Sequence, residues 1–175
     1  MAKVNKQSRN LKILTCPDVL LQKTFAMEPL DKRIDSFLRK HHVFTLATAR
    51  NNVPWCSSCF YAYLDREAAL VFTSDSATRH ASEMLDNPVA SGTVALETKI
   101  VGKIQGLQFE GRVFPAGPLW EDRCRKAYYA RFPYALLAET HFWVFLLGSV
   151  KMTDNRLGFG KKLYWNRGES LFEES

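Results

Sequence analysis

The residues best suited to chemistry lie between Leu70 and Pro88, where a polar turn leads into a short amphipathic segment. Hydroxyl side chains at Ser74 and Thr78 precede the guanidinium of Arg79 and the imidazole of His80. A helix N-terminus offers free backbone N–H groups and a partial positive charge, so such side chains placed there are typical of a phosphate site. The stretch therefore predicts an anion-binding site.

The same stretch also fits an ordinary capped surface helix. Bulky and β-branched residues at 70–73 predict a strand, and apolar residues recur at helical spacing from Ala77 to Leu85. Asn87-Pro88 ends the helix, because the residue before a proline disfavours the α region. Serine and threonine are common caps, and Asp75 brings negative charge next to the proposed anion. From these residues alone, both interpretations stay open.

The cysteines and histidines predict neither a redox motif nor a metal centre. Cys56 and Cys59 form a Cys-x-x-Cys pair, but the run from Trp55 to Leu64 has the character of one strand. Three positions apart on a strand, two side chains point to opposite faces, and their Cα atoms lie about 10 Å apart, too far for a disulfide. We therefore predict buried free thiols. None of the four histidines has a metal-like partner at a nearby spacing, so no metal site is predicted.

A glycine-containing loop, Asp154–Gly160, precedes the lysine pair Lys161 and Lys162. It lacks the glycine spacing and the following Ser or Thr of a phosphate loop. Glycines let a backbone approach a ligand closely. The lysine pair is therefore either a ligand contact or an ordinary solvated surface.

Hydrophobic periodicity predicts a mainly β protein with flanking helices. Short connections join the six predicted strands, which are 43–49, 53–64, the segment ending at Thr73, 89–96, 104–114 and 142–152, and a short edge strand is predicted at 161–165. Helices are predicted at 31–40, 77–85 and 120–132. This pattern favours a six-stranded antiparallel barrel with helices packed outside.

The bulk properties fit one globular domain. A chain of 175 residues that is 46% hydrophobic can form a single core, with residues 1–30 as an N-terminal extension, 31–168 as the domain and 169–175 as a C-terminal tail. The net charge of +6 permits phosphate-bearing ligands without requiring them. The longest apolar run, Phe142–Leu147, is far shorter than the roughly 20 residues that span a bilayer. We expect a soluble cytoplasmic protein with no membrane contact.

Four groups of residues together resemble a known family. They are Thr78-Arg79-His80-Ala81, Ile104–Gly111, Arg125–Tyr128 with Arg131–Pro133, and Thr153–Lys162 with Trp165. Over roughly residues 31–168, the chain is similar to the YhbP-like bacterial group within the flavin-binding split-barrel superfamily of pyridoxamine 5'-phosphate oxidase.

The resemblance implies a six-stranded antiparallel split β-barrel that forms a homodimer, with FMN in a cleft shared by the two subunits. In flavin-binding members the segment matching 73–80 holds the phosphate and the ribityl chain, and the strand matching Gln105 lies near the cofactor. With the loop lysine added, the candidate cofactor-binding residues are Thr73, Ser74, Thr78, Arg79, His80, Gln105 and Lys161.

Two features depart from the oxidase pattern. His80 stands where oxidases often carry lysine, so the charge there depends on pH. The strand Val53–Leu64 has no Lys or Arg, whereas the oxidases place basic residues there. The substrate-binding residues of the oxidases have no match, so oxidation of pyridoxamine phosphate itself is not expected.

Three functions follow as hypotheses. The first is an FMN-dependent oxidoreductase of unknown substrate, in which the flavin carries the chemistry; no catalytic side chain is identified. The alternative is a non-catalytic split barrel that binds a small-molecule ligand or haem, for which His80 and His141 are the motivation. The third is a dimeric scaffold, or a weak nucleic-acid binder acting through the basic residues near the N-terminus.

Overall fold

The structure, a computed structural model, describes residues 28–137 and 141–168 of the chain. The predicted C-terminal tail and all but the last three residues of the predicted N-terminal extension lie outside the described residues. None of the helices in the described ranges is long and apolar enough to cross a membrane.

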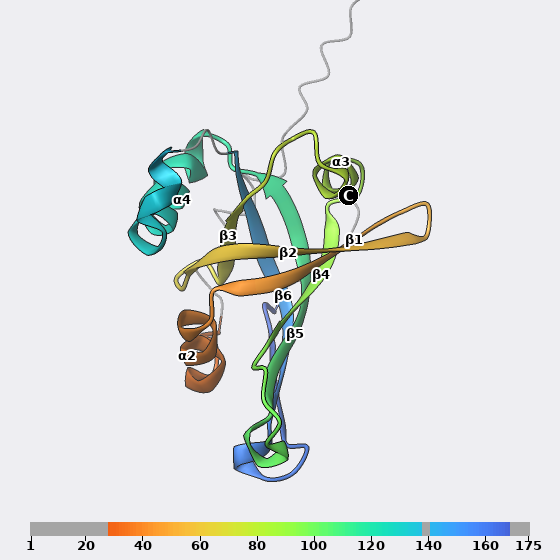
Figure 1. Cartoon of the computed structure of the whole chain (residues 1–175), viewed down its shortest axis with the longest axis vertical. Coiled ribbons are helices and arrows are strands. Elements are labelled where there is room, and N and C mark those ends of the chain that lie inside the picture. Colours follow the sequence, from red (N-terminus) through yellow and green to blue (C-terminus); the bar gives the residue numbers. More distant parts are fainter. Residues whose placement is uncertain (1–27, 138–140, 169–175) are drawn as a thin grey trace, which may run out of the picture.

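Within residues 28–137 and 141–168, seven antiparallel strands form one sheet, and six of them close into a ring (Figure 1). The strands are β1 Val43–Arg50, β2 Val53–Leu64, β3 Ala69–Thr73, β4 Val89–Ala95, β5 Gln105–Pro115, β6 Phe142–Asp154 and β7 Lys162–Asn166. Their order is β3-β2-β1-β4-β5-β6-β7, and an additional pairing of β3 with β6 closes the ring. The predicted six-stranded antiparallel barrel is confirmed, and β7 is the predicted edge strand.

In the described part of the chain, three α-helices lie outside the strands (Figure 1). They are α2 Lys32–Lys40, α3 Arg79–Asp86 and α4 Pro118–Arg131. Each helix buries one apolar face, as its spacing predicts. In α2 the buried face is Ile34, Phe37 and Leu38, and in α4 it is Trp120, Cys124 and Tyr128.

The barrel interior is filled by aromatic rings. Phe44 of β1 is fully buried and lies 5.4 Å from the Phe72 ring and 6.2 Å from the Phe145 ring, in edge-to-face geometry. Phe109 completes the group at 6.1 Å from Phe44 and 5.2 Å from Phe145. Edge-to-face pairs add to the stability that burial alone provides. A small barrel of this kind is a packed core, so ligand chemistry must take place on its outside.

The edge of β6 that faces away from β5 pairs with two different strands. Its first half pairs with β3, from Phe142 to Leu146, and its second half pairs with β7, from Ser149 to Thr153. Arg167 lies where the two partners meet and donates hydrogen bonds to the carbonyl oxygens of Leu147, Glu67 and Ala68. Burial lowers the pKa of Arg167 to about 10, so the side chain stays cationic at neutral pH.

A β-bulge in β6 requires a glycine opposite it. Glu110 pairs with Ser149 and Gly111 pairs with Leu147, so Gly148 is the extra residue. A Cβ added at Gly111 would lie 2.0 Å from the Leu146 carbonyl oxygen. Only a residue without a side chain allows the two backbones to approach this closely.

We expect Gly111→Ala to lower the free energy of unfolding by about 1–3 kcal/mol, because the methyl group overpacks a backbone contact. Urea unfolding measures the effect. Gly102→Ala is the matched control, since a Cβ at Gly102 meets no atom within 4 Å. Equal stability of the two variants would show that the β5–β6 contact relaxes without cost.

Candidate functional site

The turn between β3 and α3 is held by Asp75 and Thr78. The Asp75 carboxylate accepts a hydrogen bond from the Ala77 backbone N–H at 2.7 Å, and the Asp75 carbonyl accepts one from the Thr78 hydroxyl at 2.8 Å. Thr78 is the N-cap of α3, and its Oγ1 also accepts the Ala81 N–H at 3.3 Å. These residues therefore hold the turn through hydrogen bonds, and the Asp75 carboxylate already accepts one from a backbone N–H group.

His80 gathers three hydroxyl groups around its ring. Its Nε2 lies 2.6 Å from Ser74 Oγ and 3.3 Å from Thr78 Oγ1, and its Nδ1 lies 3.1 Å from Ser57 Oγ on β2. Ser74 Oγ also lies 3.0 Å from Thr78 Oγ1. Burial lowers the pKa of His80 and outweighs the attraction of Glu83, so the imidazole is neutral at pH 7. The cluster thus offers neutral hydrogen-bonding groups at the start of α3.

Arg79 supplies the positive charge beside this cluster. Its Nε donates to Glu83 Oε1 at 2.7 Å, and its guanidinium carbon lies 4.4 Å from the centre of the Trp55 ring. The Arg79 side chain is 46% exposed, whereas Glu83 is 3% exposed. Among the described residues, the terminal nitrogens of Arg79 make no hydrogen bond. They can therefore donate a pair of hydrogen bonds to a phosphate or carboxylate group.

Glu83 is held on its other side by β1. Thr48, itself 3% exposed, donates its hydroxyl to Glu83 Oε2 at 2.5 Å. The Thr48 hydrogen bond, followed by that from Arg79, lowers the pKa of Glu83, so this carboxylate is ionised at neutral pH.

The structure brings together some of the predicted cofactor-binding residues and separates others. Ser74, Thr78, Arg79 and His80 lie at the start of α3. Thr73 precedes them, but its hydroxyl lies 3.2 Å from the Tyr128 hydroxyl of α4.

Gln105 and Lys161 lie elsewhere in the chain. Gln105 is buried and donates to Asp154 Oδ2 at 3.0 Å, and Lys161 is exposed just before β7. Figure 1 shows the start of β5 and the loop before β7 at the end of the molecule opposite α3. Within one chain, these two residues therefore cannot share a site with Arg79.

Four contributing residues were not predicted: Thr48, Trp55, Ser57 and Glu83. One local signal was available, because Arg79 and Glu83 are four positions apart on a helix and such pairs interact. Thr48 and Trp55 face each other across the β1–β2 pairing, which no local pattern reveals. Through Ser57 and Trp55, β2 thus brings a hydroxyl group and an indole ring to the start of α3.

The prediction of free thiols is confirmed for the described cysteines, but burial was predicted wrongly for one of them. Cys59 and Cys124 are buried and Cys56 is exposed, and all three are free. Cys56 lies in the outer half of β2, where the strand is exposed on both faces. Burial raises the pKa of the Cys59 thiol to about 11, which makes it a poor nucleophile. Within the described residues, no group of three or more His, Cys, Asp or Glu could hold a metal ion.

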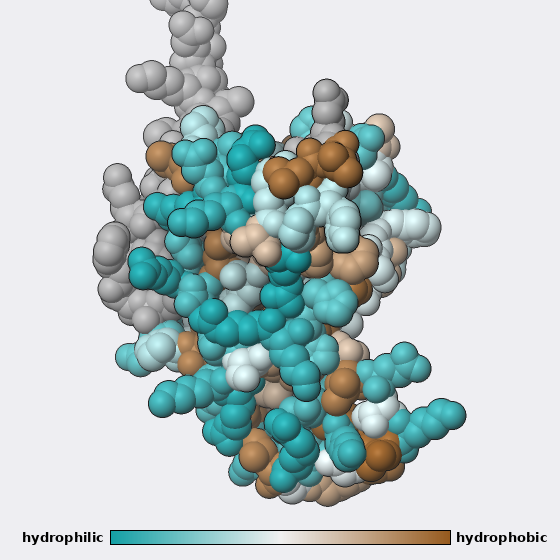
Figure 2. Space-filling model, turned by 60° about the vertical axis from the view of Figure 1, so that its left-hand side comes forward, coloured by the Kyte–Doolittle hydropathy of each residue, from teal (hydrophilic) through white to brown (hydrophobic). Residues whose placement is uncertain are grey.

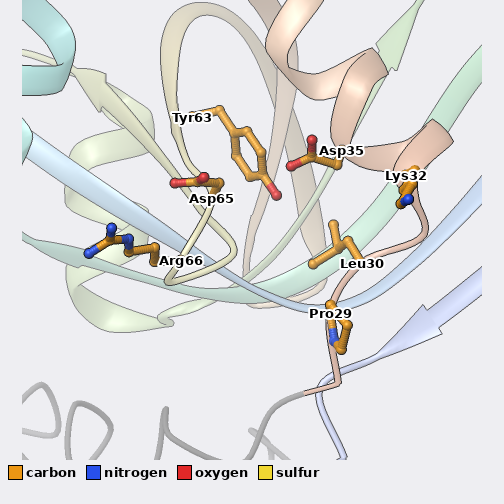
Figure 3. Close-up of a pocket in the computed structure, with 7 residues that line it drawn as sticks. All are labelled: Pro29, Leu30, Lys32, Asp35, Tyr63, Asp65 and Arg66. Carbon is orange, nitrogen blue, oxygen red and sulfur yellow. The ribbon is translucent and has the colours of Figure 1, made fainter.

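Two hollows occur away from the α3 cluster. A pocket of about 330 Å³ lies between α2 and the β2–β3 turn, and Figure 3 shows the Tyr63 hydroxyl pointing into it near Asp35 and Leu30. A groove of about 330 Å³ runs over β4 to β7, with Gln108, Lys151 and Tyr164 among its lining residues. Neither contains a predicted cofactor-binding residue.

Comparison with known proteins shows which families this chain resembles. Residues 30–141 match the family model described as pyridoxamine 5'-phosphate oxidase. A UPF0306 protein of Yersinia pestis is 40% identical over 138 residues, which cover 79% of this chain and 94% of that protein.

Solved structures share the fold at low identity. A haem-binding protein of Mycobacterium smegmatis is similar with a TM-score of 0.63 and 18% identity, over 79% of this chain and 60% of that one. A FAD-binding protein of Mesorhizobium loti has a TM-score of 0.59 and 19% identity, over 73% and 96% of the two chains.

The half-buried imidazole of His80 gives the stability a predicted pH dependence. Because the pKa of His80 is lowered in the folded protein, the unfolded chain binds the proton more readily, and stability should fall as the pH drops below about 6.5. His80→Gln should reduce this fall, which urea unfolding on both sides of that pH measures. His41, whose pKa is also lowered, accounts for part of the remaining slope. An unchanged slope in the variant would contradict a lowered pKa of His80 in the folded protein.

Proposed function

We propose, since this chain belongs to the UPF0306 group of the pyridoxamine 5'-phosphate oxidase family, that it binds FMN with the phosphate at the start of α3 and acts as a flavin-dependent oxidoreductase. The observation that carries the proposal is Arg79. Its Nε donates a hydrogen bond to Glu83, while its two terminal nitrogens remain available to an anion.

The donor set at this place fits a phosphate group. Arg79 would bind two phosphate oxygens through its terminal nitrogens, and the Ser74 and Thr78 hydroxyls would turn to donate to the others. The first backbone N–H groups of α3 add a partial positive charge. When bound, the flavin ring supplies the hydride or electron transfer, so the protein needs only to bind and orient it.

A homodimer with the cofactor cleft at its interface would unite the separated candidates. Two copies related by a two-fold axis would place Gln105 and Lys161 of one chain near Arg79 of the other. Exposed apolar residues at both ends of the molecule support this arrangement. Near α3 they include Val53 and Leu85, at 55% and 61% exposure.

At the opposite end, the exposed apolar side chains include Ile100, Val101 and Phe159, the last at 89% exposure. Figure 2 shows apolar side chains among hydrophilic ones at this end. In the proposed homodimer, the second copy would cover these side chains.

Haem or another ligand is the second candidate, favoured by the haem-binding neighbour. Both ring nitrogens of His80 already lie within hydrogen-bond distance of hydroxyl groups, so binding iron would break one of these contacts. The phosphate-binding interpretation requires no bond to either ring nitrogen of His80, and we therefore prefer flavin.

FMN should bind to the protein, and Arg79→Ala should weaken binding by about 10- to 100-fold, because a hydrogen bond to a charged group contributes about 1.5–3 kcal/mol. Fluorescence titration of FMN measures the affinity, and an absorption spectrum after desalting reports retained flavin or, after haem addition, a Soret band. Arg33→Ala is the control, since Arg33 has the same 46% side-chain exposure and a carboxylate partner, Asp31. Equal FMN affinities of wild type and Arg79→Ala would refute the phosphate role.

A shared cleft predicts complementation between two defective chains. Arg79→Ala and Lys161→Glu should each weaken FMN binding, but a heterodimer of the two variants has one site with both original side chains. Heterodimers isolated through two different tags should bind one FMN per dimer at wild-type affinity. If every site were built within a single chain, mixing would restore nothing.

A further inference from the structure

Glu83 is a charged side chain placed where burial is costly. It is 3% exposed, lies on the inner side of α3, and uses both carboxylate oxygens, one towards Arg79 and one towards Thr48. A buried carboxylate with fewer partners would be strongly destabilising. Capping and packing of α3 do not require this group, because Thr78 caps the helix, and Ala81 and Met84 form its apolar face.

The partners of Glu83 restrict how Arg79 can point. The carboxylate occupies the Nε edge of the guanidinium at 2.7 Å, and the Trp55 ring covers one of its faces at 4.4 Å. The edge formed by the two terminal nitrogens is what remains for a ligand. Holding a long side chain in this orientation before binding removes part of the entropy cost of ordering it later.

We propose that Glu83 is a positioning residue that makes this site selective for phosphorylated flavin over riboflavin, an inference that rests on the proposed function. Trp55 assists by stacking on the guanidinium, and Thr48 fixes the carboxylate from β1. The three residues act on the phosphate only through Arg79. Riboflavin lacks the group that Arg79 contacts, so its binding does not depend on them.

The direction in which Glu83→Gln changes FMN affinity distinguishes a positioning role of Glu83 from a purely electrostatic one. A negative group near a phosphate repels it, so if Glu83 acted only through its charge, Glu83→Gln would tighten FMN binding. If Glu83 orients Arg79, Glu83→Gln weakens FMN binding although a negative charge has been removed. Riboflavin affinity stays the same under the positioning role.

The experiment is a titration of FMN and of riboflavin into wild type, Glu83→Gln, Trp55→Leu and Asp86→Asn. We expect wild type to prefer FMN, and the preference to fall by about 3- to 10-fold in Glu83→Gln and in Trp55→Leu, as for loss of one hydrogen bond or stacking contact. Asp86→Asn is the matched control, because Asp86 is an exposed carboxylate on the same helix that pairs with Arg50 instead.

Each outcome decides a different point. An unchanged or increased FMN preference in Glu83→Gln overturns the positioning role. A wild type that binds neither flavin overturns the proposed function and this inference with it. Equal affinity for the two flavins refutes the phosphate contact and this inference, but leaves flavin binding itself standing. Should Glu83→Gln fail to fold, Trp55→Leu still decides, since Trp55 is 43% exposed and its replacement leaves the core intact.

A second readout needs no flavin. The Nε–H proton of Arg79 should exchange slowly with water in the wild-type protein, because Glu83 accepts it, and NMR can follow that signal directly. Glu83→Gln should speed the exchange, whereas Asp86→Asn should not. Fast exchange in the wild type would show that Arg79 is not held before the ligand arrives.

Discussion

Pairing between β3 and the first half of β6 closes the ring, and the position of the candidate site follows from this closure. β3 is five residues long and ends at Thr73, so the chain must turn at once into α3. The helix therefore starts at the end of the barrel, next to the exposed half of β2. Where β6 passes from β3 to β7, Arg167 donates hydrogen bonds to three carbonyl oxygens, one of them at Leu147. Charge-assisted bonds of this kind are strong where water is excluded.

Hydrogen-bond geometry matters more than charge at the start of α3. The chain carries +6 overall, but the cluster has a neutral imidazole, and Glu83 offsets Arg79 locally. What the cluster offers instead is direction, since the hydroxyls of Ser74 and Thr78 and the Nε edge of Arg79 are each held by a named partner. The proposed phosphate site would therefore depend on the shape of an anion as much as on its charge.

The strands and helices were predictable because each carries a local signal. The alternation from Leu107 to Val113 places β5, and Asn87-Pro88 ends α3. The site was predictable only in part. Thr48 reaches Glu83 across 35 positions, and the exposure of Cys56 follows from how far the β1–β2 hairpin extends beyond its neighbours. Such features depend on the path of the whole chain, so no window of sequence contains them.

The division of β6 between two neighbours has a consequence for association. β7 is the last strand in the sheet order, and a last strand presents unpaired backbone groups to which another chain could add. Here that strand is only five residues long, begins at Lys162 directly after Lys161, and alternates an exposed Tyr164 with a buried Trp165. Shortness and positive charge at an edge both discourage edge-to-edge polymerisation. The edge of the sheet at β7 can thus remain without a neighbouring strand and still not promote the edge-to-edge association of many chains.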